Sequence, residues 1–444
     1  MNKRFTVYLY ITLLFITAPF YSSSMSTPGT LDPSFTDESL GITPGLVVTN
    51  FDGGFDVAHA LITQPDLKLV AAGSAVVGGT TNFALARYLP NGTLDPNFGT
   101  GGKVVTNFPL GADSTAFALI LQTDGKLVAA GESNNNFALV RYFPHGGLDL
   151  NFGNNGIVTT DFNTGNDAAF ALILQPDGKL VAAGQAEVTP GNLDFALARY
   201  LPNGTLDPDF GNGGKVTTPI SGNGDIAFAL ILQPDGKLVA AGQQLEGGGS
   251  SNFALVRYLP NGLLDLNFGD QGKVITDFDG GDDIAHALIL QPDGKFVAAG
   301  FVSAEGNNFG LARYLPNGSL DPDFGNGGKV ITSFSAGVDI ANALILQPDG
   351  KLVAAGISDS DFALARYLSN GTLDPNFGTG GKVTTDFNLG GIDEANSLSF
   401  QIQGTQLKLV AAGRAGEDFG LARYFLINNI TPLASAVIAK YCFN

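Results

Sequence analysis

Residues 225–276 read DIAFALILQPDGKLVAAGQQLEGGGSSNFALVRYLPNGLLDLNFGDQGKVIT, and this unit determines the architecture of the chain. Residues 229–233 and 237–241 are two β-type runs around Pro-Asp-Gly, a pattern that predicts a hairpin. Residues 253–259 predict a third strand, ended by Pro-Asn-Gly, and residues 273–276 predict a fourth. We name these strands A, B, C and D in chain order.

The unit recurs along the chain. The closing glycine of Leu-Val-Ala-Ala-Gly, once Phe-Val-Ala-Ala-Gly, returns at intervals of 53 to 58 residues. The motifs Phe-(Ala/Gly)-Leu-(Ala/Val)-Arg-Tyr and Leu-Asp-(Pro/Leu)-x-Phe give the same count of seven. Four short strands without helical periodicity, repeated at this interval, predict an all-β, seven-bladed β-propeller with four antiparallel strands per blade. A β-solenoid, the rival all-β repeat, has shorter coils and fewer hairpin turns.

The phase of the repeat predicts how the ring closes. The first strand, residues 45–49, is a D strand without A, B or C before it, and the last unit ends on strand C at Tyr424. Pairing these two ends completes the seventh blade and removes an open sheet edge. We therefore expect a lead-in segment at 25–44 and a propeller at 45–428, with its closing strand at 45–51. The tail at 429–444 is unassigned.

The N-terminus carries the pattern of a secretory signal peptide. Lys3 and Arg4 precede an apolar run at 5–20, and small polar residues follow up to Ser24. An uncleaved anchor needs about 20 apolar residues, which this run does not reach cleanly. We expect residues 1–24 to be removed and the protein to be periplasmic, cell-surface or extracellular. We also expect a monomer without a transmembrane segment after signal removal.

Composition excludes several classes of function. A formal net charge of -18 disfavours binding to nucleic acid or to an anionic membrane surface. Cys442 is the sole cysteine, so no internal disulfide and no Cys/His metal spacing exist. Gly-x-Ser-x-Gly, His-Glu-x-x-His and Gly-Lys-Ser/Thr motifs are missing, and no catalytic residue and no cofactor are predicted.

The repeat resembles the delta-60 repeat family of bacterial β-propellers, whose signatures are similar to LDPSFGxxGKVxT, ALxxQPDGKLVxAG and FxLxRYxxNG. The resemblance covers residues 31–424, with the motifs in order seven times. It implies a bacterial exported propeller and transfers no catalytic residue. Unit seven departs from the pattern, because residues 401–406 replace Gln-Pro-Asp-Gly at the A–B turn.

Two sets of repeated ionisable residues are interpreted as structural. In the first six units the strand C arginine precedes an aspartate by eight residues, which predicts an ion pair, and an anion-binding ring is the alternative. The aspartates before strand A predict either turns held by backbone N–H bonds or a ring that collects a cation. The arginines are Arg87, Arg141, Arg199, Arg257, Arg313, Arg366 and Arg423, and the aspartates are Asp56, Asp113, Asp167, Asp225, Asp283, Asp339 and Asp393.

The position three residues after that aspartate differs from blade to blade, with a one-residue insertion in blade two. It is the candidate ligand-binding position, at the channel mouth, and inter-blade packing is the alternative. Its histidines are in blades one and five, so a shared metal is not expected. An acidic loop with Asp279, Asp282 and Asp283 is a weaker Ca²⁺ candidate. The channel-mouth residues are His59, Phe117, Phe170, Phe228, His286, Asn342 and Asn396.

The two faces of the ring differ in their loops. The A–B and C–D turns share one face and carry the repeated Pro-Asp-Gly and Pro-Asn-Gly, whereas the D–A and B–C loops vary. Function concentrates on variable loops held by a rigid scaffold. We expect a binding or interaction module for an unknown protein or small molecule that uses the D–A and B–C face. The alternatives are a lyase, lactonase or hydrolase with a site at the channel mouth, and a structural surface protein.

Overall fold

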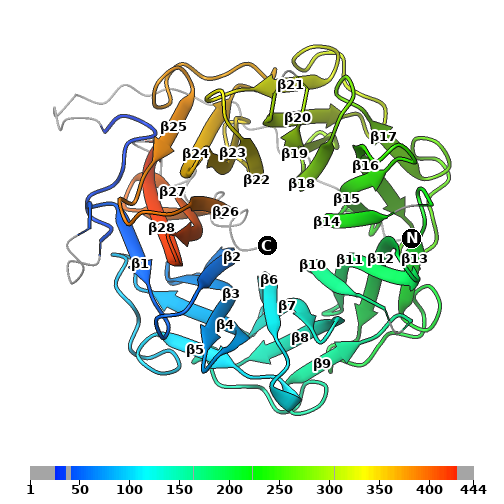
Figure 1. The fold of residues 1–444 in the computed structure, drawn as a ribbon, viewed down its shortest axis with the longest axis horizontal. Helices are drawn as coiled ribbons and strands as arrows, with labels where there is room; N and C mark the ends of the chain where they lie inside the picture. The colour runs from blue at the N-terminus through cyan, green and yellow to red at the C-terminus, as the bar shows by residue number, and fades with distance from the viewer. Residues whose placement is uncertain (1–25, 37–41, 164, 223, 305, 428–444) are drawn as a thin grey trace, which may run out of the picture.

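The computed structural model describes residues 26–36, 42–163, 165–222, 224–304 and 306–427. Seven four-stranded antiparallel sheets are arranged in a ring around a central axis, as Figure 1 shows. The predicted all-β, seven-bladed propeller is confirmed. No helix in the described part of the chain is long and apolar enough to cross a membrane. The predicted signal peptide, residues 1–24, and the predicted tail, residues 429–444, lie outside the described residues.

Each blade runs from an innermost A strand to an outermost D strand. The A strands are β2 (Asp56–Thr63), β6 (Ser114–Leu121), β10 (Ala168–Leu174), β14 (Asp225–Leu232), β18 (Asp283–Leu290), β22 (Asp339–Leu346) and β26 (Asp393–Gln403). The B strands are β3 (Leu69–Val77), β7 (Leu127–Ser133), β11 (Leu180–Thr189), β15 (Leu238–Leu245), β19 (Phe296–Val302), β23 (Leu352–Ser358) and β27 (Gln406–Ala415).

The outer half of each blade holds strands C and D. The C strands are β4 (Thr80–Tyr88), β8 (Asn136–Tyr142), β12 (Asn192–Tyr200), β16 (Ser251–Tyr258), β20 (Asn308–Tyr314), β24 (Asp361–Tyr367) and β28 (Asp418–Ile427). The D strands are β5 (Lys103–Thr106), β9 (Ile157–Thr160), β13 (Lys215–Thr218), β17 (Lys273–Thr276), β21 (Lys329–Thr332), β25 (Lys382–Thr385) and β1 (Leu46–Thr49). A 3-10 turn, Pro109–Gly111, precedes β6.

The N-terminal strand closes the ring, as the phase of the repeat predicts. β1 pairs antiparallel with β28, with Leu46 opposite Ala422 and Thr49 opposite Phe419. The first and the last of the described strands therefore lie side by side in blade seven, and Figure 1 shows β1 beside β28. The lead-in segment contributes as well, because Leu31 bridges to Tyr424 and Phe35 is fully buried.

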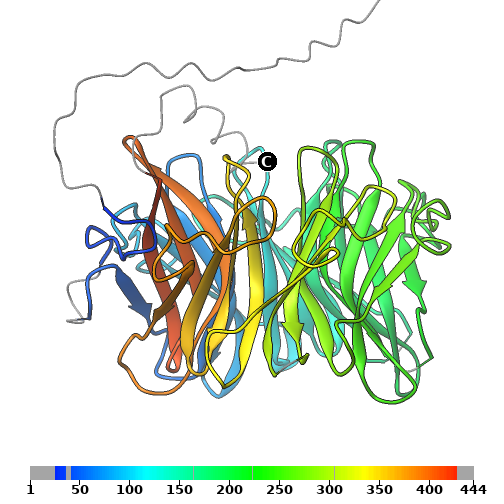
Figure 2. The same cartoon turned by 90° about the horizontal axis from the view of Figure 1, so that it is seen from above.

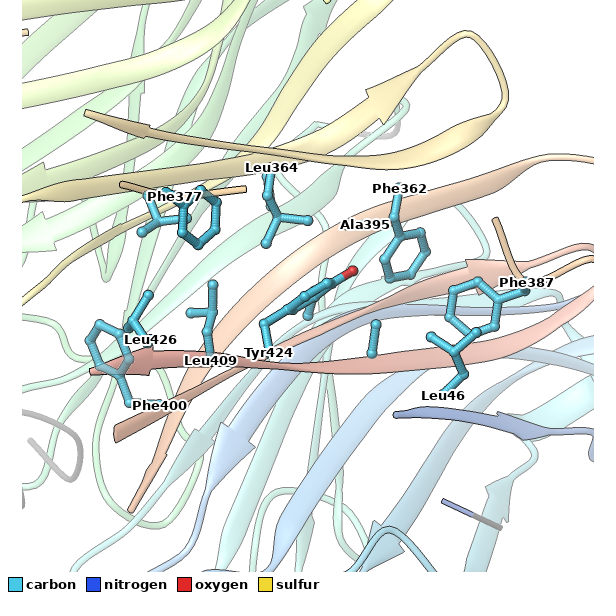
Figure 3. Packing of buried hydrophobic residues seen from close by; sticks show 14 of the residues in the cluster. Leu46, Phe362, Leu364, Phe377, Phe387, Ala395, Phe400, Leu409, Tyr424 and Leu426 are labelled. Carbon is cyan, nitrogen blue, oxygen red and sulfur yellow. The ribbon is translucent and has the colours of Figure 1, made fainter. Parts of the chain in front are cut away.

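The hydrophobic core is divided into layers between neighbouring blades. Figure 3 shows one layer, in which Phe362 and Leu364 of blade six pack against Leu409 and Tyr424 of blade seven and Leu46 of β1. The tyrosine of each C strand also shares a buried hydrogen bond of 2.8–3.0 Å with the threonine that ends the previous D strand. The pairs are Tyr88–Thr49, Tyr142–Thr106, Tyr200–Thr160, Tyr258–Thr218, Tyr314–Thr276, Tyr367–Thr332 and Tyr424–Thr385.

Strands B and C are longer than the sequence suggests, and most B–C connections are correspondingly short. In blade two, β7 and β8 are joined by Asn134 and Asn135 alone, both with positive φ. Two such residues form a tight hairpin turn whose twist matches the flanking strands. Strands B and C therefore extend beyond their apolar runs toward the D–A and B–C side.

The A–B turn of unit seven, on the opposite side, is reduced to Gly404 and Thr405 between β26 and β27.

Candidate functional site

The connections between strands gather on two faces, which Figure 2 shows from the side. On the loop face, the D–A and B–C connections meet: Thr81 N, near the start of β4, donates to Asp113 Oδ1 in a D–A loop at 2.8 Å. On the turn face, the A–B and C–D connections meet: Lys68 Nζ lies 3.2 Å from Asp95 Oδ2. The two faces are therefore built from different sets of residues.

The turn face uses the repeated arginines as ties between blades. Arg199 Nε donates to Asp207 Oδ2 at 2.8 Å, and its Nη1 donates to Pro260 O of the next blade at 2.5 Å. The guanidinium also lies over the Phe210 ring, 4.5 Å from its centroid. The other arginines reach the carbonyls of Pro144, Pro202, Pro316, Ser369, Leu426 and Pro90.

A lysine completes each of these networks. Lys179 Nζ lies 3.0 Å from the same carboxylate oxygen of Asp207. Burial alone would raise the pKa of Asp207, but hydrogen bonds from Lys179 and a backbone N–H, together with the charge of Arg199, lower it below its ordinary value. Six of the seven arginines donate from Nε to an aspartate, and Arg366 Nε lies 3.0 Å from Asp374 Oδ2, so the ring of arginines serves the scaffold.

The aspartates at the start of strand A act as loop caps. Asp283 Oδ2 accepts the backbone N–H of Phe278 at 2.7 Å, and burial raises the pKa of Asp56 and Asp283 to about 6. Blade two differs, because Ser114 occupies this place and Asp113, one residue earlier, is exposed. The same capping bond is made by Asp56, Asp167, Asp225, Asp339 and Asp393.

The seven variable residues form a continuous ring around the channel, which we call the channel belt: His59, Phe117, Phe170, Phe228, His286, Asn342 and Asn396. Each sits at a β-bulge; in blade one, Ala58 pairs with Gly73 and Ala60 with Ala72, so His59 has no partner on β3. A Cβ on Gly73 would lie 1.9 Å from Val57 O. The repeated glycine of the Leu-Val-Ala-Ala-Gly motif is thus the sequence signal of the bulge.

One side of the belt is aromatic. Ring centroids are separated by 5.1 Å between His59 and Phe117, by 5.0 and 5.2 Å along the three phenylalanines, and by 5.3 Å between Phe228 and His286. Burial lowers the pKa of His59 to about 4 and also lowers the pKa of His286. Three phenylalanines separate the histidines, which are neutral at pH 7.

The other side of the belt is polar. Asn342 Nδ2 lies 2.9 Å from Glu394 Oε1 and 3.1 Å from Asn396 Oδ1, and Asn396 Nδ2 donates to Ala58 O at 3.1 Å. His286 Nδ1 lies 3.1 Å from Ala341 O. The polar residues on this side of the belt therefore bond to the next blade, and all seven belt residues are only partly buried.

A pocket opens on the loop face where blade seven meets blade one, and we call it the seam pocket. Its volume is about 670 Å³, and Phe55, Leu389 and Ile392 supply exposed apolar side chains. Arg414 lies in its wall, with the guanidinium carbon 5.2 Å from the centroid of Phe55. The rest of the lining is Gly390, Gly391, Ala415, Gly416, Glu417 and Asp418.

The sequence did hold a signal for this pocket. Arg414 follows the repeated glycine of strand B, and no other blade has a cation there. At this register the other blades carry Ser74, Glu132, Gln185, Gln243, Phe301 and Ile357.

Acidic side chains also converge on the loop face, but not where the sequence suggested. Among the described residues, Asp361, Asp386 and Asp393 form the one acidic trio whose oxygen atoms lie within 4.8 Å of one another. Both carboxylate oxygens of Asp393 already accept backbone N–H groups, from Phe387 and Gly416. This trio is the group that could hold a cation.

The acidic loop singled out for Ca²⁺ engages its carboxylates with the backbone. Asp282 Oδ1 accepts the N–H of Ser251 at 3.0 Å, and Asp283 caps Phe278. Asp279 has a φ of 89°. Calcium binding by Asp279, Asp282 and Asp283 stays a prediction.

Comparison with known proteins supports a β-propeller repeat protein. A family model described as "Domain of unknown function (DUF5122) beta-propeller" matches six segments, residues 64–98, 122–152, 175–210, 233–268, 291–324 and 347–377. No curated protein matches the chain.

Solved structures with a similar fold have diverse descriptions. A catalytically inactive virginiamycin B lyase from Staphylococcus aureus, with quinupristin, is 12% identical; 86% of this chain and 99% of that one are covered, with a TM-score of 0.47. An ulvan lyase is 12% identical over 90% and 100%, with a TM-score of 0.46. Extracellular domains 1-2 of Drosophila Semaphorin 1b are 8% identical over 85% and 88%, with a TM-score of 0.43. At these values the likenesses carry no argument about function.

Proposed function

We propose that this β-propeller repeat protein is an exported member of the delta-60 repeat family and acts as a binding module whose ligand contacts the loop face. The N-terminal signal pattern supports export, and the ordered motifs support the family. The acidic surface favours a ligand that is neutral or carries positive charge.

The observation that carries the proposal is the unequal use of charged groups on the two faces. On the turn face, the repeated arginines and lysines are paired with buried aspartates in all seven blades. On the loop face, Arg414 is the one described arginine outside this set, and its Nε is buried without a hydrogen-bond partner among the described residues. The Arg414 side chain is only partly buried and pairs with no aspartate of the described residues, so its charge is available to a ligand on this face.

The test compares two triple variants in a thermal-shift screen with divalent cations, small metabolites and short peptides. The loop-face variant replaces Phe55, Val338 and Ile392 with Ser, and the matched turn-face variant replaces Leu150, Leu263 and Leu266. All six side chains are exposed, by 42–45% and 59–65% respectively. A ligand at a hundred times its Kd stabilises the native state by about 2.7 kcal/mol.

We expect the loop-face variant to lose the shift that the wild-type chain shows and the turn-face variant to keep it. Loss of the shift in the turn-face variant alone would contradict the proposal, as would the absence of any stabilising ligand.

A further inference from the structure

The geometry of the seam pocket points to a specific ligand class: we propose that it binds a free α-amino acid with an apolar side chain. This inference rests on the proposed function and identifies its ligand. Each of the three parts of such a ligand finds a counterpart in the pocket.

Arg414 is the counterpart of the ligand carboxylate. No carboxylate of the described residues lies within 4.0 Å of a nitrogen of its guanidinium. The side chain of Glu394, opposite Arg414 on β26, is instead engaged with Asn342. A planar guanidinium that is not paired with a carboxylate of the described residues matches the two oxygen atoms of a ligand carboxylate. The Phe55 ring beside it restricts the guanidinium, so less freedom is lost on binding.

Three exposed apolar side chains are the counterpart of the ligand's side chain. Phe55, Leu389 and Ile392 are exposed by 45%, 47% and 42%, although they are large hydrophobic residues. They come from both sides of the seam, since Phe55 precedes β2 of blade one and the other two precede β26 of blade seven. Covering them with an apolar group removes apolar surface from water, which stabilises the complex.

Two glycines bring the loops together into a floor. Gly391 and Gly416 have φ values of 92° and 59°, which favour glycine. A Cβ on Gly416 would lie 2.9 Å from Gly390 O, and one on Gly391 would lie 3.3 Å from Gly416 Cα. The D–A loop therefore lies directly against the B–C turn, and the resulting volume of about 670 Å³ is in the range of small-molecule sites.

Glu417 and Asp418 are the counterpart of the ligand's ammonium group. Glu417 is exposed at the rim, and Asp418 Oδ1 accepts one hydrogen bond, from Asn50 Nδ2 at 2.7 Å. Burial, followed by the charge of Glu417, raises the pKa of Asp418, so a nearby ammonium would favour its ionised form. A zwitterion also has no net charge, and the charge of -18 does not repel it as it would an anion.

Isothermal titration of the chain without residues 1–24 tests the inference, with L-phenylalanine and L-leucine as probes. L-phenylalaninamide lacks the carboxylate, and 3-phenylpropionate lacks the ammonium. We expect saturable binding of at least one amino acid and affinities weaker by about tenfold or more for both analogues.

The variant Arg414→Gln should lose about tenfold or more in affinity. Glutamine stands at this register in blades three and four, as Gln185 and Gln243, so the change is compatible with the strand. Gln185→Ala is the matched control and should bind as the wild-type chain does. Circular dichroism melts establish that both variants are folded.

The inference is overturned if neither amino acid binds saturably, if Arg414→Gln binds normally, or if either analogue binds as tightly as its parent. A different ligand whose thermal shift disappears in the loop-face triple variant but persists in Arg414→Gln would overturn this inference alone and leave the proposed function standing.

Discussion

The guanidinium of each repeated arginine makes two contacts: it pairs with a buried aspartate, and it donates to a carbonyl of the next blade. Arg199 binds Asp207 and Pro260 with two separate N–H groups. The variant Arg199→Lys keeps the positive charge, but the lysine has a single nitrogen for both partners. We expect a loss of about 2 kcal/mol in the free energy of unfolding, measured by urea denaturation.

Lys215→Arg is the control for this substitution. Lys215 is a partly buried residue whose Nζ donates one exposed bond to Asp161 O at 3.0 Å, so the change should stay within about 0.5 kcal/mol. If both substitutions change the free energy of unfolding equally, the hydrogen bond from Arg199 to the next blade does not contribute to stability.

A belt histidine makes stability depend on pH. Burial lowers the pKa of His59 to about 4 from an ordinary 6.5, so between these values the unfolded chain binds the proton more tightly and acid favours unfolding. His59→Phe inserts the residue that the next three blades carry. It should add stability that grows to roughly 2 kcal/mol as the pH falls from 8 to 5.

Urea denaturation of wild type and His59→Phe at pH 5, 6.5 and 8 measures this difference. A constant difference across the three values would show that His59 titrates normally in the folded protein.

Strands and turns of the propeller are predictable because their signals are local. Pro-Asp-Gly with its flanking apolar runs is enough for a hairpin, and the phase of the repeat is enough for β1 to pair with β28. The channel belt was harder to predict from the sequence. Its bulges depend on how closely β2 approaches β3 at Gly73, and the sequence of one strand alone does not reveal that approach. The length of strands B and C was also missed, since Asn134 and Asn135 are as typical of a loop as of a two-residue turn.

The closing seam differs from the other blade junctions in one buried ion cluster. Asp32 Oδ2 accepts hydrogen bonds from Lys408 Nζ at 2.6 Å and Arg423 Nε at 2.7 Å. The side chains of Lys408 and Arg423 are exposed by only 2% and 0%, whereas Lys179 beside Asp207 is 25% exposed. Loss of the carboxylate at the seam therefore leaves two buried cations that water does not reach.

Asp32→Asn should be more destabilising than the matched Asp207→Asn. We expect a loss of about 3–5 kcal/mol at the seam, the range for breaking a buried pair, and a smaller loss inside the ring. Thermal melts with light scattering measure both effects, because release of β1 also exposes the edge of β28 to aggregation. Equal melting temperatures would show that the seam needs no special pairing.

For the molecule as a whole, the sequence distinguished the two faces but did not reveal the seam pocket. Loop variation was visible in the sequence, whereas the pocket depends on Phe55 and Arg414, which are far apart in the chain and meet only when the ring closes. Likewise, the belt residues were found as a variable position, but their contact around the channel follows from closure. Aligning the repeats singles out Arg414 as the one cation at its register, but the alignment does not show that Arg414 meets Phe55 across the ring closure.

The opposing pKa shifts predict the acid stability of the whole ring. Burial raises the pKa values of Asp56 and Asp283 to about 6 from the ordinary 3.8. As the pH falls from about 6 toward 3.8, protonation of these two carboxyls therefore stabilises the folded state relative to the unfolded chain. His59 and His286, whose pKa values are lowered by burial, lose stability over the same window, so the two effects offset each other. The turn-face carboxyls behave differently: their lowered pKa values contribute stability above 3.8 that is lost as the pH falls through the folded-state values. They are Asp32, Asp95, Asp149, Asp207, Asp265, Asp321 and Asp374.

We therefore expect a nearly constant free energy of unfolding from pH 7 to about 4.5 and a steep fall below about 4, where seven carboxyls take up protons together. Urea denaturation at intervals between pH 2.5 and 7 measures the profile. The double variant His59→Phe and His286→Phe removes the opposing effect, so its stability should rise as the pH falls from 7 to 4.5 and then fall as steeply as that of the wild type. A profile that declines steadily from pH 7 would contradict the balance of the belt histidines and the capping aspartates. A profile that stays level below pH 4 would instead contradict the role of the turn-face network in holding the blades together.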